Sequence, residues 1–290
     1  MKGVDTMVTL DKEKLKELKK RATKIRMHVI EATYNACCGH PGGSLSCADI
    51  LSVLYFHEMR IDPSNPGWPD RDRFILSKGH CSPALYGALA ERGFFPADEI
   101  KKFRHIDSYL QGHPDMRKVP GVEISSGSLG QGLSAANGMA LAARLDGKNY
   151  RVFVLMGDGE IEEGQIWEAA MTSAHYGLDN VTAFLDHNGL QIDGRITEVM
   201  SPEPVDEKFK AFGWNVISIN GHDYMQIVEA VEQAGKTKGK PTIIIAETIK
   251  GKDVSFMENE AGWHGMAPNA EQYEKAMSEL KAILDRLEVE

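Results

Sequence analysis

The turn Gly157-Asp158-Gly159 combines residue types that can hold an anionic ligand through a metal ion. It directly follows the continuously apolar run 152–156, which is expected to be a buried strand. Two glycines let the backbone approach a ligand closely and direct the N-terminus of the next helix toward an anion. The carboxylate of Asp158 would repel a bare pyrophosphate, and a divalent cation between the two groups removes that repulsion.

Asn188 is the candidate second ligand of that cation. It lies 30 positions after Asp158, just beyond the next apolar run at 181–185. Neighbouring parallel strands would bring both residues to the same edge of a sheet. Segment 186–194 is then a loop that offers the Asn188 side chain and the Leu190 carbonyl, oxygen ligands that Mg²⁺ or Ca²⁺ accepts. Either residue alone is more often a turn or helix cap, whereas the pair after consecutive strands favours a metal site.

Other classes of enzyme that use similar residues are disfavoured by spacing. The dinucleotide pattern G-x-G-x-x-G is not met, because the next glycine, Gly164, lies five positions beyond Gly159. The neighbourhood of Ser128 lacks the G-x-S-x-G pattern of serine hydrolases. Neither an H-E-x-x-H motif nor paired-cysteine spacing is present, which argues against a zinc enzyme.

Histidines form a second group of candidate site residues. Four of the ten lie in turns flanked by glycine or proline: His40, His80, His113 and His264. Three others fall within helical patterns and are interpreted as ordinary core or surface residues: His28, His57 and His175. Four histidines near the ends of expected strands and helices indicate a site, although a single histidine in a turn is usually structural.

The elements that must position these residues alternate along the chain. Buried strands are expected at 73–77, 151–156, 181–185, 214–219 and 242–246. Helices are expected at 15–38, 46–58, 130–145, 165–176, 225–238 and 269–287, with a proline-rich loop at 62–73. This order predicts an α/β fold with a doubly wound, mostly parallel sheet and helices on both faces. One domain over 1–290, with long N-terminal and C-terminal helices, is the simplest division.

Composition excludes several other functions. A chain of 290 residues that is 42% hydrophobic can bury a proper core. The net charge of −9 argues against a nucleic-acid track, and no apolar run approaches the roughly 20 residues that span a bilayer. The four cysteines show no C-x-x-C spacing, and the N-terminus does not resemble a signal peptide. We therefore expect reduced thiols and a cytoplasmic location.

The Gly157-Asp158-Gly159 turn and the later Asn188-Gly189 together resemble the metal and diphosphate signature of thiamine-diphosphate enzymes. Further motifs occur in the order and approximate spacing seen in transketolases: Gly39-His40-Pro41-Gly42, Ser77-Lys78-Gly79-His80, Gly112-His113-Pro114, Gly127-Ser128-Leu129-Gly130-Gln131-Gly132 and Trp263-His264-Gly265. The resemblance covers nearly the whole chain. It corresponds to the N-terminal, diphosphate-binding portion of the transketolase family and implies the thiamine-diphosphate-binding fold.

The resemblance implies roles for the cofactor residues. Thiamine diphosphate and Mg²⁺ (or Ca²⁺) are the implied cofactors, with the metal on Asp158, Asn188 and the Leu190 carbonyl. His80 would lie against the diphosphate, and Gly127 and Leu129 would pack around the aminopyrimidine and thiazolium. The other implied cofactor-binding residues are Gly157, Asp158, Gly159, Glu160, Asn188 and His264. Glu163 would belong to a carboxylate network at the interface between chains.

The histidines take catalytic roles by the same resemblance. Cleaving a carbon–carbon bond of a ketose needs a base, donors for the developing alkoxide and groups that orient hydroxyls, which histidine can supply near neutral pH. His40 and His264 would contact the reacting oxygens and assist proton transfer. His113 would hydrogen-bond the donor sugar, and His80 completes the implied catalytic set.

The implied activity is transfer of a two-carbon ketol unit from a ketose phosphate to an aldose phosphate, as in the pentose phosphate pathway. In the family, the glutamate that activates the cofactor lies farther along the chain, in a pyrimidine-binding domain. The sequence here stops at Glu290, which predicts a separate partner chain with two copies of each.

Departures from the family pattern and rival functions stay open. Ser128 stands where many transketolases have proline, and Met266 stands where some have lysine. Lys250 and Lys252 follow the expected strand 242–246, where they could meet phosphate or remain solvated. The rival functions are a related split ketol transferase, a relative resembling deoxyxylulose-phosphate synthase, and a noncatalytic regulatory module that binds the cofactor.

Overall fold

A sheet of five parallel strands forms the centre of the molecule in the computed structural model, which describes residues 10–289. The strand order is β1-β2-β3-β7-β6, and every neighbouring pair is parallel. The strands are β1 (Arg73–Leu76), β2 (Val152–Gly157), β3 (Val181–His187), β6 (Asn215–Asn220) and β7 (Thr242–Glu247). The predicted α/β fold with a parallel sheet is confirmed. The single-domain division stays a prediction, and residues 1–9 and 290 lie outside the described part.

The strands are apolar along their whole length because both faces of the sheet are covered. In β2, Val152 and Val154 belong to the hydrophobic cluster on one face, whereas Phe153 and Leu155 belong to the cluster on the other. All four side chains are fully buried. Successive side chains of a strand point to opposite faces, so burial on both sides replaces the usual alternation with a continuous apolar run.

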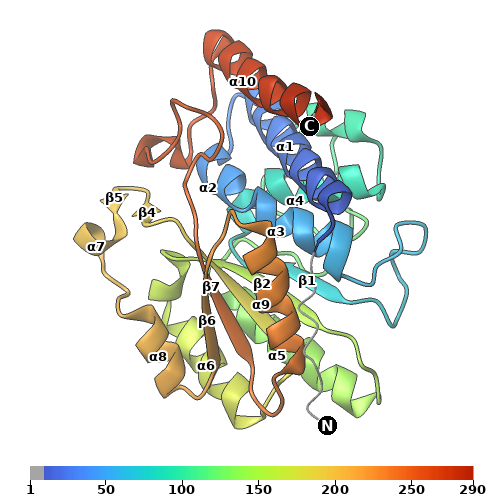
Figure 1. Cartoon of the computed structure of the whole chain (residues 1–290), viewed down its shortest axis with the longest axis vertical. Coiled ribbons are helices and arrows are strands. Elements are labelled where there is room, and N and C mark those ends of the chain that lie inside the picture. The colour runs from blue at the N-terminus through green and yellow to red at the C-terminus, as the bar shows by residue number, and fades with distance from the viewer. Residues whose placement is uncertain (1–9, 290) are drawn as a thin grey trace.

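Helices cover the two faces (Figure 1). One cluster includes residues of α1 (Lys12–Asn35), α3 (Ala48–Val53), α4 (Ser82–Arg92), α9 (Tyr224–Lys236) and α10 (Ala270–Val289). The other includes residues of α5 (Gln131–Leu145), α6 (Gly164–His175) and α8 (Val205–Ala211). Helix α10 packs against α1, which joins the two ends of the described chain.

Two segments differ from the sequence-based expectation. The helix expected at 46–58 begins earlier, as α2 (Pro41–Ser46), continues as α3 and ends in the π-helical turn η1 (Leu54–Glu58). Pro41 occupies the first turn, where its missing N–H costs nothing. The loop expected at 186–194 contains the ribbon of β4 (Leu190–Gln191) and β5 (Gly194–Arg195), which α7 (Ile196–Val199) follows.

Helices α4 and α8 were not expected. Residues 82–90 of α4 are buried on every side, so the sequence has no amphipathic period there. The remaining short helical turns are η2 (Gly79–Cys81), η3 (Ala97–Lys102), η4 (Glu160–Glu162) and η5 (Ala261–His264).

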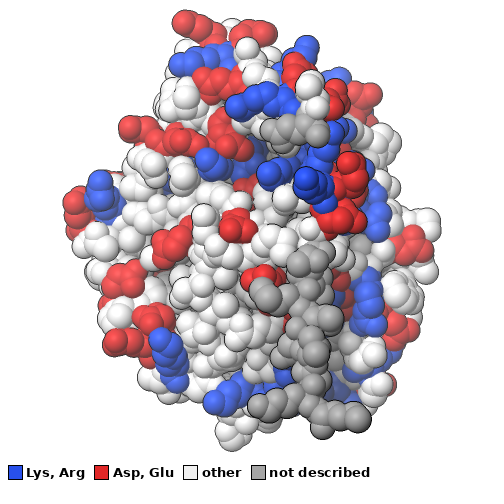
Figure 2. All heavy atoms as spheres, viewed as in Figure 1, with Lys and Arg blue, Asp and Glu red and all other residues white. Residues whose placement is uncertain are grey.

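Charged side chains of both signs are interspersed over the face seen in Figure 2, where no extended basic track is visible. Among residues 10–289, no helix combines the length and the apolar character needed to cross a membrane. Because all five strands run in the same direction, the loops that follow them meet at one edge of the sheet. That edge carries the candidate site.

Candidate active site

A cavity of about 270 Å³ opens at the carboxyl ends of the strands. Eleven of the twelve predicted site residues line it: His40, His80, Gly127, Leu129, Gly157, Asp158, Gly159, Glu160, Asn188, Leu190 and His264. The twelfth, His113, lies next to Gly127, where a Cβ added to the glycine would be 3.1 Å from the imidazole. The structure therefore brings both predicted groups, the metal ligands and the histidines, to one cavity.

Asp158 is a buried carboxylate in the turn after β2. Its two oxygens accept hydrogen bonds from the backbone N–H of Gly159 at 2.9 Å and of Gly189 at 2.6 Å. Burial, followed by the negative charge of Asp186, raises the pKa of Asp158 to about 6. Two carboxylates at one sheet edge are unfavourable without a compensating cation.

Asp186 is the hub beneath this turn. It is fully buried, and its oxygens accept from Ser46 at 2.6 Å and from the Thr248 hydroxyl and the Lys78 ammonium. Burial opposes ionisation of Asp186, but the Lys78 charge and these donors hold its pKa below the usual range. The Asn188 amide nitrogen also donates to Asp186, at 3.3 Å. Asp186 thereby orients the Asn188 side chain.

The second half of the predicted metal set lies in the turn after β3. The Asn188 side-chain oxygen accepts from the N–H of Leu190 at 3.2 Å, and the Leu190 carbonyl accepts from the Lys250 ammonium at 3.2 Å. Lys250 is only 2% exposed, and burial lowers its pKa. The Lys250 ammonium thus donates a hydrogen bond to the carbonyl that was predicted to bind a metal ion.

The residues present fit a hard divalent cation with phosphate. Within residues 10–289, no group of three or more His, Cys, Asp or Glu side chains could hold a metal by itself. Asp158, the Asn188 amide and the Leu190 carbonyl supply three oxygens, which leaves places for phosphate or water around such an ion. The charge of the cation would also offset the repulsion between Asp158 and Asp186.

Glu160 connects three segments of the cavity wall by hydrogen bonds. Its carboxylate accepts from the Ser77 hydroxyl at the end of β1, from Gly130 N–H at 2.9 Å, where α5 begins, and from Gly157 N–H at 3.1 Å. The residue is 2% exposed, and burial raises its pKa. Glu160 was predicted to bind the cofactor, and in the structure it joins three elements around the cavity.

Two kinds of glycine occur in and around the cavity wall. A Cβ added to Gly157 or Gly159 would meet no atom nearer than 3.5 Å, so neither glycine is required by packing within the chain. In contrast, a Cβ on Gly132 would lie 2.4 Å from the Ser77 hydroxyl, and one on Gly79 would lie 2.7 Å from the Ser126 backbone. The first pair leaves room on the cavity side, whereas the second pair permits close packing of the surrounding loops.

Three of the predicted histidines form a triangle over the cavity. The ring centres of His40 and His80 are 5.1 Å apart, those of His80 and His264 are 5.3 Å apart, and those of His40 and His264 are 5.5 Å apart. The Lys250 ammonium lies 3.1 Å from Nδ1 of His264. Because an ammonium only donates, Nδ1 of His264 accepts and the ring proton is on Nε2.

Burial keeps these rings neutral. It is the largest cause that lowers the pKa of His40 and His80 to about 4 and of His264 to about 3. Nearby positive groups add to the effect, Lys78 on His80 and Lys250 on His264. The Nδ1 atom of His40 is buried and has no hydrogen-bond partner among residues 10–289. A buried polar atom without a partner favours a site that a ligand completes.

Some site residues were missed or left open by sequence reasoning. Gly43, Lys78, Gln191 and Ile192 also line the cavity. Lys78 lies within a motif already singled out, but its buried pairing with Asp186 joins positions 108 apart and leaves no local pattern. Lys250 belongs to the cavity, whereas Lys252 lies outside its lining and pairs with Glu258 at 3.2 Å. Glu163 is exposed beside Gly130.

Known proteins share this fold and sequence. A family model described as "Transketolase, thiamine diphosphate binding domain" matches residues 18–282. A 6-deoxy-6-sulfo-D-fructose transketolase subunit of Clostridium sp. is 47% identical, over 91% of this chain and 96% of that protein. One of the subunits of the apulose-4-phosphate transketolase of Phocaeicola vulgatus is 45% identical, over 94% of this chain and 97% of that protein.

The crystal structure of transketolase from Campylobacter jejuni superposes with a TM-score of 0.85 and 35% identity. The match covers 93% of this chain but only 45% of the solved one, so the chain spans less than half the length of that transketolase. The predicted resemblance is confirmed. This chain belongs to the transketolase family and corresponds to its N-terminal, thiamine diphosphate binding part.

Proposed function

We propose that this chain binds thiamine diphosphate with a divalent metal ion and, together with a second chain, transfers a two-carbon ketol unit from a ketose phosphate to an aldose phosphate. The proposal rests on one observation. Asp158, Asn188 and the Leu190 carbonyl line the same cavity as three neutral histidines. The first group suits a metal diphosphate, and the second suits proton transfer at a sugar.

Lys78 and Lys250 bring two ammonium groups to the diphosphate end of the cavity. Lys78 is committed to Asp186 and to the Gly43 carbonyl at 2.7 Å. Lys250 holds the Leu190 carbonyl, an acceptor that a metal ion would take over. We therefore assign Lys250 to the diphosphate, which would gain a charge-assisted hydrogen bond when the ammonium is released from the carbonyl.

When bound, thiamine diphosphate would supply the nucleophile and electron sink that cleave the carbon–carbon bond of a ketose. The chain itself supplies positioned proton donors and acceptors. The proton on Nε2 of His264 can be donated to an alkoxide that develops on the substrate. His40 is neutral, and its buried Nδ1 has no hydrogen-bond partner in the described part of the chain, so it can hold a substrate hydroxyl or accept its proton. His113 lies farther out, beside Gly127, and is assigned to the donor sugar.

A second chain is proposed to complete the site. Two relatives that match over nearly their whole length are named as transketolase subunits, whereas the solved transketolases are more than twice as long. Ile192 lines the cavity and is 67% exposed, an apolar contact that a covering chain would bury. We propose that the partner carries the pyrimidine-binding domain and the activating glutamate, in an assembly with two copies of each chain.

The experiment has two readouts. The first is calorimetric binding of thiamine diphosphate to this chain with Mg²⁺, with Ca²⁺ and with a chelator. The second is ketol transfer from xylulose 5-phosphate to ribose 5-phosphate, for this chain alone and mixed with its candidate partner. Metal-dependent binding with activity only in the mixture is expected. Binding with no transfer from that donor, but with turnover of a sulfonated or branched ketose, would change the substrate and keep the enzyme class. Absence of metal-dependent binding would overturn the proposal.

A further inference from the structure

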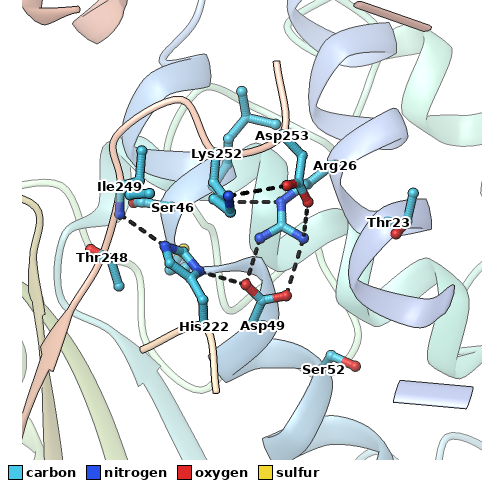
Figure 3. A network of polar contacts seen from close by, with 12 residues as sticks. Thr23, Arg26, Ser46, Asp49, Ser52, His222, Thr248, Ile249, Lys252 and Asp253 are labelled. Carbon is cyan, nitrogen blue, oxygen red and sulfur yellow. Dashed lines mark hydrogen bonds and ion pairs between the residues drawn. The ribbon is translucent and has the colours of Figure 1, made fainter. Parts of the chain in front are cut away.

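A polar network joins the turns after β6 and β7 to helices α1 and α3 (Figure 3). Its members come from four places in the chain: Arg26 from α1, Asp49 from α3, His222 from the turn after β6, and Ile249 from the turn after β7. Ile249 flanks cavity residue Lys250 and Asp49 lies six positions after cavity residue Gly43, whereas Arg26 and His222 are distant from the site in sequence. None of them lines the candidate active site.

Asp49 is the centre of this network and its acceptor sites are fully used. It is 3% exposed and receives two hydrogen bonds from Arg26, at 3.1 and 2.6 Å. The Tyr224 hydroxyl donates to it at 2.6 Å, and Nδ1 of His222 lies 2.7 Å from its second oxygen. Burial disfavours the charge, but Arg26 and the hydrogen bond from His222 hold the pKa of Asp49 below its ordinary value.

The carboxylate of Asp49 fixes the tautomer of His222. An ionised carboxylate only accepts, so Nδ1 of His222 must carry the proton and donate. In the neutral ring, Nε2 then has a lone pair. The backbone N–H of Ile249 points at that atom and donates to it at 2.9 Å. The two contacts require the same tautomer, which makes the arrangement self-consistent.

The backbone at Ile249 lies between a side chain that supports the candidate site and one that lines it. Thr248, immediately before it, donates its hydroxyl to Asp186, the hub that orients Asn188. Lys250, immediately after it, donates to the Leu190 carbonyl and to Nδ1 of His264. A rotation of the peptide at Ile249 would displace both side chains, because they leave the chain on either side of it.

We propose that His222, oriented by Asp49, is a positioning residue that fixes the backbone at Ile249 and thereby sets Thr248 and Lys250 for the metal diphosphate. This inference rests on the proposed function for the identity of the ligand. It assigns the His222–Ile249 hydrogen bond a role in holding the site, and it assigns the Tyr224 and Arg26 contacts of Asp49 to stability of the fold.

The test compares three variants of the full chain. His222→Leu removes the acceptor of the Ile249 N–H, whereas His222→Gln retains a side-chain oxygen that can accept the same bond. Tyr224→Phe is the matched control, because it removes one hydrogen bond of Asp49 and leaves the His222–Ile249 contact intact. Amide hydrogen exchange of the peptide spanning 247–252 is measured first, without ligand. Binding of thiamine diphosphate in the presence of Mg²⁺ is measured second.

His222→Leu is expected to speed exchange at 247–252 and to weaken ligand binding about 10-fold or more. His222→Gln should recover most of both effects. Tyr224→Phe should lower the melting temperature and change neither. Equal effects of His222→Leu and Tyr224→Phe at the cavity, or unchanged exchange in His222→Leu, would overturn the positioning role. If the wild-type chain binds no thiamine diphosphate, the proposed function fails, and the exchange measurement still decides whether His222 fixes this turn.

Discussion

The Lys250 ammonium lies 3.1 Å from Nδ1 of His264 and connects the two halves of the cavity. The same ammonium donates to the Leu190 carbonyl in the predicted metal set. The buried Lys250 ammonium thus sets the tautomer of His264, a candidate proton donor. It also donates to the Leu190 carbonyl, a candidate metal ligand. Filling the metal site would therefore change the surroundings of His264 directly.

Replacing Lys250 tests this connection. Lys250→Met removes a positive charge that lowers the pKa of His264, so that pKa should rise from about 3 toward its ordinary value. Binding of thiamine diphosphate should weaken on the order of 10-fold or more, because a charge-assisted contact is lost. Titration of the imidazole signals by NMR measures the first effect and calorimetry the second. Lys252→Met is the control, since Lys252 lies outside the cavity, and equal shifts of His264 in both variants would contradict the assignment.

Asp158→Asn tests the metal site. The loss of a ligand charge should weaken metal-dependent binding of thiamine diphosphate by about 100-fold, while circular dichroism shows an intact fold. In the wild-type chain, binding should also weaken as the pH falls through about 6, because the protonated carboxyl of Asp158 no longer attracts a cation. Asp206→Asn provides a matched control on α8, at a half-exposed carboxylate outside the cavity. Retention of wild-type affinity by Asp158→Asn would remove this residue from the metal set.

Two glycine substitutions should distinguish a glycine that leaves room for a ligand from one that the packing of the fold requires. Gly159→Ala meets nothing nearer than 3.5 Å, so the unliganded chain should keep its stability within about 1 kcal/mol while losing affinity for the diphosphate. Gly132→Ala would place a methyl group 2.4 Å from the Ser77 hydroxyl, which should cost roughly 1 to 3 kcal/mol of stability. Urea unfolding and ligand titration distinguish the two. Normal binding by Gly159→Ala would show that the ligand does not approach this turn.

The neutral histidines should make the fold sensitive to acid. The pKa of His80 is about 4 in the folded chain and 6.5 in the reference state, so the unfolded chain takes up the proton first as the pH falls. Stability is then complete above pH 6.5 and is lost between pH 6.5 and about 4. His80→Gln should remove roughly 1 to 2 kcal/mol of the destabilisation that the wild type shows between pH 7 and 5. Unfolding by urea at both pH values checks this, and an identical acid dependence in the two proteins would contradict a neutral buried His80.

The strands were predictable because burial on both faces leaves a continuous apolar run, as in 152–156. Residues 82–90 of α4 give no such signal, because a helix buried on every side lacks a polar face. The start of α2 at Pro41 was also missed, since the glycines that follow it are typical of turns. Their helical conformation is set by packing, for example of Gly42 against the Trp263 carbonyl.

The candidate site was predictable where residues follow strands or lie in recognisable motifs, as do Asp158, Asn188 and His264. Its supporting contacts were not. The pairing of Lys78 with Asp186 and the contact of Lys250 with Leu190 arise from the sheet order, which places turns far apart in sequence against one another. His222 does not lie in a recognisable motif, because its proposed role depends on the hydrogen bond that it accepts from the backbone N–H of Ile249.

The three hydrogen bonds of Glu160 determine how the cavity responds thermodynamically to a ligand. Because they hold β1, β2 and the start of α5 together without help from outside the chain, this wall has little freedom left to lose. A ligand that fills the cavity should therefore order little of this wall, and the entropy of its binding should come mainly from the water that it releases.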